Sequence, residues 1–149
     1  MVGLCVATGR LRGENLDGLA RLADTFGSGE VRLTKGQNLI LINVAEAKLP
    51  QLIAEPLLKG LSPDSSAFLR GLMACTGSDY CNLALVKTKD MARKLAASLT
   101  TQHPQGLPAT MHWSRCLAGC GNHLTANVNF QGGQARSNGL IVDAVGIFV

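Results

Sequence analysis

Aromatic residues are scarce in this 149-residue sequence, which has one Trp, one Tyr and four Phe. Aliphatic side chains must therefore fill the interior, and a chain of this length with 46% hydrophobic residues can bury a core. No apolar run reaches the roughly 20 residues that a membrane-spanning helix needs, and no secretory leader pattern is found. The expectation is a cytoplasmic protein with no membrane partner and with reduced thiols.

Charge of either sign is also not concentrated in any segment. The 14 Lys and Arg residues against 10 Asp and Glu residues give a net charge of +4. The basic residues are scattered and are not interleaved with aromatic residues, so nucleic acid is not a predicted partner. A mild positive charge does permit an anionic partner, such as an anionic tetrapyrrole or an acidic electron donor.

Apolar residues in the first 60 positions follow both the strand and the helix period, which predicts mixed structure. Predicted strands cover 2–8, 31–34 and 39–42, and predicted helices run from a cap at Asn15 or Asp17 to Phe26 and over 46–59. Pro56 is expected to bend or fray the second helix. This alternation predicts an α+β fold with helices on one face of a sheet.

The segment 60–66 (GLSPDSS) is the predicted boundary between two parts of the chain. After it, the sequence predicts a helix over 88–99 and strands over 110–114, 127–130 and 140–148. The segment 131–138 is rich in Gly, Ser and Asn and is predicted to be a turn or surface loop.

Four of the five cysteines form two short pairs, Cys75 with Cys81 and Cys116 with Cys120. Four thiolates are what a [4Fe–4S] cluster requires, one for each iron. Zinc is a rival, although its usual pairs are closer in sequence than Cys75 and Cys81. Disulfides are disfavoured in a chain that is not cysteine-dense, and buried unrelated thiols stay possible. Cys5 lies in an apolar strand and is expected to be a core residue.

Three segments resemble motifs of the siroheme-dependent nitrite and sulfite reductases. Residues 74–81 (ACTGSDYC) resemble the first cluster motif of this family, residues 112–121 (HWSRCLAGCG) the second, and residues 27–40 (GSGEVRLTKGQNLI) an upstream segment. The segments occur in the family's order, and the similarity runs from Val2 to the last residue. The residues that follow Cys75 and those that precede Cys116 are most similar to the ferredoxin-dependent nitrite reductase branch of the family.

The resemblance implies an architecture and an activity. Residues 1–65 would be a ferredoxin-like half domain, and residues 66–149 a nitrite/sulfite reductase 4Fe–4S and siroheme-binding domain. Members of the family contain two homologous halves, and this chain resembles the second. The implied reaction is reduction of nitrite to ammonia, or of sulfite to sulfide, with electrons from ferredoxin or another low-potential donor.

The resemblance also implies the site residues. Cys75, Cys81 and Cys116 would be cluster ligands, and Cys120 would bridge the cluster and the siroheme iron, which makes it the catalytic candidate. Other implied siroheme contacts are Gln37 and Ala74, which match family positions, and Arg32, Asn38 and Asn122, which lie beside such positions. For Arg32, whose planar fork suits a carboxylate, a solvated residue at a strand edge is an equal alternative.

Two departures from the family pattern affect the expected activity. Leu117-Ala118-Gly119 stands where the family usually has Pro-Asn followed by Ser or Gly, which removes a rigid turn and one polar siroheme contact. The family's substrate-binding Arg and Lys residues come from the first half, so this chain alone is expected to be inactive. Alternatives are a non-catalytic iron–sulfur electron-transfer or siroheme-binding module that needs a partner chain, and a protein of cobalamin synthesis similar to precorrin-3B synthase.

Overall fold

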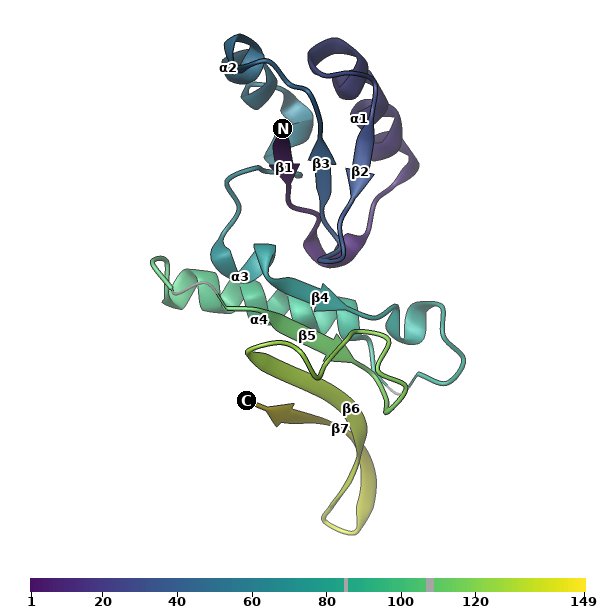
Figure 1. The fold of residues 1–149 in the computed structure, drawn as a ribbon. Helices are drawn as coiled ribbons and strands as arrows, with labels where there is room; N and C mark the ends of the chain where they lie inside the picture. Colours follow the sequence, from purple (N-terminus) through teal and green to yellow (C-terminus); the bar gives the residue numbers. More distant parts are fainter. Residues whose placement is uncertain (85, 107–108) are drawn as a thin grey trace. The chain divides into compact units, whose positions relative to one another are not determined.

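The computed structural model describes residues 1–84, 86–106 and 109–149, and the chain divides into two compact units, Met1–Ser65 and Ser66–Val149 (Figure 1). Each unit has a sheet and a hydrophobic core of its own. Helices and strands are mixed in both, so the predicted α+β class is confirmed. Among the described residues, no helix combines the length and the hydrophobicity that crossing a bilayer requires.

The first unit is a three-stranded antiparallel sheet covered by helices. The strands are β1 (Val2–Leu4), β2 (Val31–Leu33) and β3 (Leu39–Leu41), in the order β1-β3-β2. The principal helix is α1 (Gly13–Phe26), and α2 (Leu49–Ile53) is much shorter. Alternation along β3 buries Leu39 and Leu41 on the face that carries the core.

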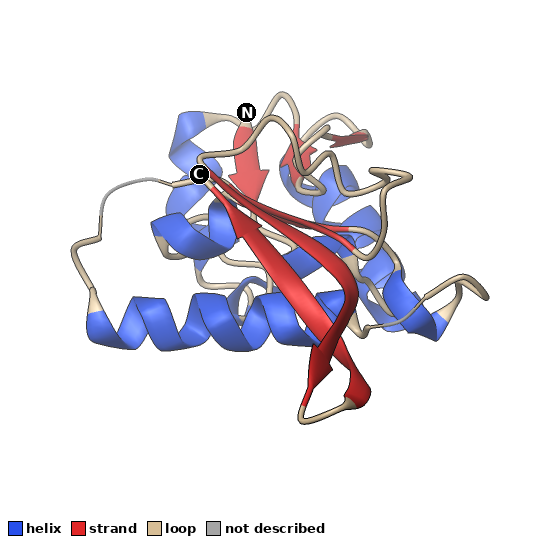
Figure 2. Ribbon diagram, turned by 90° about the horizontal axis from the view of Figure 1, so that it is seen from below, coloured by secondary structure: helices blue, strands red, loops and turns tan. Residues whose placement is uncertain are grey.

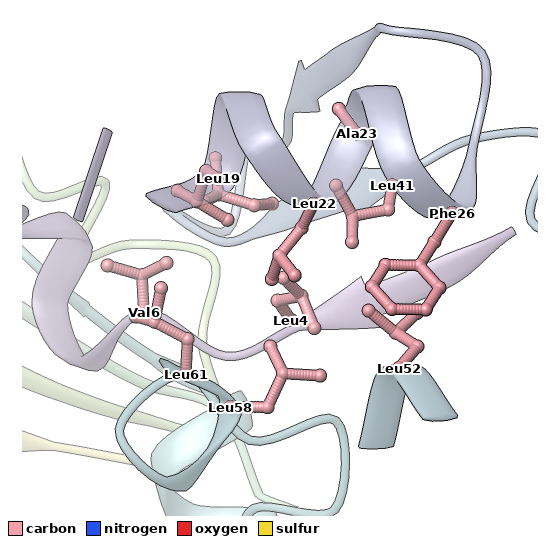
Figure 3. Packing of buried hydrophobic residues seen from close by; sticks show 11 residues of the cluster. Leu4, Val6, Leu19, Leu22, Ala23, Phe26, Leu41, Leu52, Leu58 and Leu61 are labelled. Atoms are coloured by element: carbon pink, nitrogen blue, oxygen red, sulfur yellow. The ribbon is translucent and has the colours of Figure 1, made fainter. Parts of the chain in front are cut away.

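Leucines form most of the core of this unit, as the shortage of aromatic residues predicts. Figure 3 shows side chains from α1 pointing toward those of β1 and of the helical segments that follow β3. Its buried members are Leu4, Val6, Leu19, Leu22, Ala23, Phe26, Leu39, Leu41, Leu52, Leu58 and Leu61.

Several boundaries in the first unit differ from the prediction. The helix predicted over 46–59 is three short pieces, namely a 3₁₀ turn at Glu46–Lys48, α2, and a 3₁₀ turn at Pro56–Lys59. Proline lacks an N–H and its ring clashes with the preceding turn, so Pro56 starts a new segment. The strand predicted over 2–8 ends at Leu4, and α1 begins before Asn15, whose side chain accepts the Arg12 N–H at 2.9 Å.

The second unit is a four-stranded mixed sheet in the order β4-β5-β6-β7. The strands are β4 (Leu72–Ala74), β5 (Met111–Ser114), β6 (Val128–Ser137) and β7 (Leu140–Phe148). The first three are parallel, whereas β6 and β7 form a long antiparallel hairpin, which Figure 2 shows with its narrow turn. The helices are α3 (Ala67–Arg70) and α4 (Thr88–Gln102).

The surface loop predicted over 131–138 is wrong, because β6 continues through Ser137 and pairs with β7. Only Asn138 and Gly139 form the turn, with φ values of 51° and 79°. Asn-Gly with two positive φ angles is the favoured two-residue hairpin turn. The hydrogen bonds between β6 and β7 therefore outweigh the low strand propensity of the Gly and Ser residues in 131–137.

A hydrophobic core packs against β4 and β5, the two strands that precede the cysteine pairs. Small residues of α4, Ala92 and Ala96, are fully buried against this sheet. The rings of Trp113 and Phe130 stack with centroids 4.1 Å apart and planes within 8°. The ends of β4 and β5, which precede the two cysteine pairs, are thereby fixed to the same layer.

Candidate functional site

The two cysteine pairs come together in the second unit. Their four thiols line one cavity of about 110 Å³. The remaining lining residues are Thr76, Leu83, Arg115 and Ala118. None of the four paired cysteines takes part in a disulfide. Residues separated by up to 45 positions in the sequence thus share a single cavity, as the paired spacing predicts.

Cys75 follows directly after β4 and is held from both sides. Its N–H donates to the Trp113 carbonyl oxygen at 2.9 Å, which continues the pairing of β4 with β5. The Cys75 carbonyl oxygen accepts a 2.8 Å hydrogen bond from the hydroxyl of Thr88, the first residue of α4. Both residues are buried. The backbone of Cys75 is therefore fixed by strand β5 and by the first residue of α4.

A tight turn leads from Cys75 to Cys81. Gly77 has φ +67°, and a Cβ there would lie 2.6 Å from the Thr88 hydroxyl, so this position requires glycine. The Cys81 N–H donates to the Gly77 carbonyl oxygen at 3.1 Å. The turn returns the chain to the cavity that Cys75 lines.

The second pair is held by glycines on both sides of Cys120. The Gly119 N–H donates to the Cys116 carbonyl oxygen at 3.3 Å, and Gly119 has φ +70°. The Gly121 N–H donates to the Ser114 hydroxyl at 2.9 Å, and a Cβ on Gly121 would overlap the Trp113 carbonyl oxygen. Left-handed Gly119 forms this turn although the family's Pro-Asn pair is missing.

Arg115 lies against the cavity and was not identified from the sequence. Its side chain is buried, with a relative exposure of 4%, and Nη1 donates to the Cys81 sulfur at 3.2 Å. A backbone hydrogen bond from Leu83 and the Arg115 guanidinium together hold the pKa of the Cys81 thiol below its usual range. Its place in the sequence, immediately before Cys116, could have indicated that Arg115 lies at the site. Both residues directly follow β5, which leads the chain to the cavity.

The four thiols differ in exposure. Cys75 is buried, Cys81 and Cys116 are partly exposed, and Cys120 is exposed. A thiolate at the exposed end of the cavity can be approached by a second group from outside, which the buried Cys75 cannot. The order of exposure therefore distinguishes Cys120 from the other three.

The metal that four cysteines can hold depends on how their side chains are placed. Within the described ranges, no three or more His, Cys, Asp or Glu side chains are placed to hold one ion. A mononuclear zinc site needs its ligands to converge on one centre, whereas a cubane cluster gives each thiolate its own iron. The four cysteines that line the cavity are the donor set that a cubane cluster takes.

Two residues expected to contact siroheme lie in the same unit as the cysteines. Ala74 is fully buried at the end of β4, and its carbonyl oxygen accepts a 3.2 Å hydrogen bond from Lys89 Nζ. Asn122 has φ 52°, and its carbonyl oxygen lies 2.8 Å from His112 Nδ1. His112 is itself buried, so Asn122 is anchored next to the second cysteine pair.

The other three lie in the first unit. Gln37, with φ 60°, and Asn38 line a cavity of about 260 Å³ at the hairpin between β2 and β3. The Asn38 side-chain oxygen accepts the Val6 N–H at 2.9 Å, which ties the hairpin to the segment after β1. Arg32 is 63% exposed on the edge strand β2, and its Nε donates to Glu30 at 2.6 Å.

Comparisons with known proteins give a consistent result. Residues 1–58 match the family model of the nitrite/sulfite reductase ferredoxin-like half domain. Over 99% of its length the chain is 47% identical to a ferredoxin–nitrite reductase of Synechococcus elongatus and 44% identical to the chloroplastic enzyme of Zea mays. It is 40% identical to the assimilatory ferredoxin-dependent nitrite reductase of Haloferax mediterranei.

A solved structure agrees with these sequence relatives. The Mycobacterium tuberculosis NirA protein superposes with a TM-score of 0.89 and 28% identity, over 97% of this chain and 28% of that one. The chain spans 29%, 26% and 26% of the three sequence relatives, so it corresponds to between a quarter and a third of each relative's length.

Proposed function

Because the chain belongs to the nitrite/sulfite reductase family, we propose that it is the part of a ferredoxin-dependent nitrite reductase that holds a [4Fe–4S] cluster and the axial thiolate of siroheme. In this proposal residues 1–65 are the ferredoxin-like half domain and residues 66–149 the cluster and siroheme-binding domain. The substrate is nitrite and the electron donor ferredoxin, because the names of the three sequence relatives give both.

The observation that carries the proposal is the convergence of four cysteine thiols on one cavity. The donor set is right for a cubane cluster, which takes four thiolates. A buried guanidinium beside Cys81 supplies positive charge where a cluster with four thiolates is negative. Cys75, Cys81, Cys116 and Cys120 are therefore the proposed ligands.

Cys120 is proposed as the residue that is shared with siroheme. Cys120 is an exposed residue that also lines the cavity, so it is the one of the four that a group outside the cavity could reach, while the turn through Gly119 and Gly121 holds its backbone. When bound, the two cofactors would supply single-electron transfer and anion reduction, since conversion of nitrite to ammonia takes six electrons. The chain's own part is to hold both cofactors through one thiolate.

The remaining proposed siroheme contacts are Ala74 and Asn122 in the second unit and Arg32, Gln37 and Asn38 in the first. The Arg32 guanidinium and the amide N–H groups of Gln37, Asn38 and Asn122 suit the carboxylates at the edge of a tetrapyrrole. Ala74 has only a buried methyl group, so its proposed contact is one of packing. Asn38 also has a structural role, because its side-chain oxygen holds the Val6 N–H.

Iron content of the anaerobically reconstituted 149-residue chain tests this proposal. Close to four irons and four sulfides per chain are expected, and Cys75→Ser should lose most of them because one corner of the cubane has no ligand. Cys5→Ala is the matched control, since Cys5 lies in the other unit, and it should keep the wild-type content. Stoichiometric zinc without iron would contradict the proposal.

A further inference from the structure

Arg115 is a buried cation with a sulfur atom as its hydrogen-bond partner. The side chain is 4% exposed and lines the cavity, and Nη1 lies 3.2 Å from the Cys81 sulfur. Its Nε is also buried and makes no hydrogen bond to any described residue. Both observations point to an anionic group in this cavity that the guanidinium would face.

No carboxylate neutralises this guanidinium in the part of the chain that the structure describes. Other arginines of the described residues do pair with carboxylates, as Arg12 does with Glu14, Arg21 with Glu55, Arg32 with Glu30 and Arg93 with Asp90. All four of those arginines have solvent-accessible side chains. Arg115 differs from them in lying at the wall of the cysteine cavity.

Burying a charge without a compensating partner is unfavourable, and arginine does not lose its proton to avoid the cost. The compensating charge must therefore come from the cavity. Four thiolates contribute four negative charges to a [4Fe–4S] centre, which outweigh the positive charge of its core. Lys89, a cation near the first pair, directs its Nζ to the Ala74 carbonyl oxygen at 3.2 Å.

We propose that Arg115 is a positioning residue of the cluster that, through its contact with Cys81, stabilises the reduced state and raises the cluster's reduction potential. The inference rests on the proposed cluster. Reduction adds one electron to the centre and breaks no bond, so it increases the negative charge that the guanidinium faces. Net charge and hydrogen bonds to the sulfurs are two of the factors that set the potential of such clusters.

A redox titration of the reconstituted chain tests the role of Arg115. Dithionite is the reductant, and electron paramagnetic resonance measures the reduced cluster. At a fixed potential, R115Q should lower the ratio of reduced to oxidised cluster about tenfold, which corresponds to a midpoint about 59 mV more negative. R115K keeps the charge but not the planar fork and should fall between R115Q and the wild type.

Arg93→Gln is the matched control, because this arginine lies on α4 and pairs with Asp90 at the surface. Its midpoint should equal that of the wild type. Equal midpoints for R115Q and the wild type, each with four irons, would overturn the role of Arg115 and leave the proposed cluster intact. A wild-type chain without iron would overturn the cluster itself. If R115Q does not retain iron, the test is made with R115K. A midpoint in R115K equal to that of the wild type would then reject the proposed effect of the contact between Arg115 and Cys81.

Discussion

The hydroxyl of Thr88 donates a 2.8 Å hydrogen bond to the carbonyl oxygen of Cys75. The same hydroxyl oxygen lies 3.7 Å from the Cys75 sulfur, and Thr88 is fully buried. The first residue of a 15-residue helix thus fixes the backbone of the first proposed ligand. A helix that contributes no ligand therefore determines where one side of the cavity lies.

Thr88→Val should destabilise the second unit. Valine has a similar shape but no hydroxyl, so the buried Cys75 carbonyl oxygen would lose a donor at a cost of about 1–3 kcal/mol. Urea unfolding followed by the fluorescence of Trp113, the single Trp and a core residue of this unit, measures the change. Thr101→Val, at an exposed position where the hydroxyl bonds within α4, is the control. Equal losses in the two variants would contradict the prediction.

Gly121→Ala should damage the second cysteine pair. The added Cβ would overlap the Trp113 carbonyl oxygen and press on the Ser114 hydroxyl, so the turn must move. Overpacking of this kind costs about 1–3 kcal/mol, and we expect iron retention after reconstitution to fall as well. Gly133→Ala in β6, where a Cβ would meet nothing within 4 Å, should keep both stability and iron. A Gly121→Ala chain with wild-type iron content would disprove this prediction.

The first unit should show a pH-dependent contribution from Glu55. The hydrogen bond from the Arg21 guanidinium, 2.6 Å long, holds the pKa of Glu55 below its ordinary value. A carboxyl whose pKa is lower in the folded state stabilises above its unfolded pKa of about 4.3, and this stabilisation is lost as the pH falls through the folded pKa.

Glu55→Gln should therefore lower the melting temperature at pH 7 and lower it less at pH 3. The effect should be small, because exposed ion pairs are screened by solvent. Circular dichroism melts between pH 3 and pH 7 measure it. Arg21→Gln removes the other partner and should show the same loss at pH 7. A Glu55→Gln deficit that is equally large at pH 3 would point to packing instead of charge.

The isolated chain should show almost no turnover of nitrite or sulfite with dithionite. Siroheme carries several carboxylates, and each missing charge-assisted contact weakens its binding by about 1.5–3 kcal/mol. The resemblance places the anion-binding cations in a homologous half outside this chain, which spans 29% or less of the relatives compared. Adding that half in trans should raise siroheme affinity and restore some turnover. Robust nitrite reduction by the 149-residue chain alone would refute the prediction.

The sequence predicted the elements with strong periodicity, such as α1 and α4, and the two cysteine pairs that it singled out line one cavity. The boundary errors have local causes. Pro50 and Pro56 divide a helical segment that its leucine pattern presents as continuous. Both strands of the β6–β7 hairpin were predicted, but β6 was predicted to end at 130, because the Gly and Ser residues of 131–138 resemble a loop although Asn138-Gly139 specifies a tight hairpin turn.

Other features of the site depend on contacts that no sequence pattern reports. The strand β4 has only three residues and no visible alternation, yet pairing with β5 determines where Cys75 lies. The position of Arg115 immediately before Cys116 places it near the site, but only the fold shows that it is buried against Cys81. Such residues are identified by what surrounds them in space, which one sequence does not contain.

The hairpin that completes the second sheet has a consequence for handling the protein. β7 is the edge strand of its sheet, and Ile141, Ile147 and Phe148 are each more than half exposed along it. An exposed apolar edge offers unpaired backbone groups as a template for further strands. We therefore expect the isolated chain to self-associate through β7, so light scattering should rise with concentration while the circular dichroism spectrum stays constant.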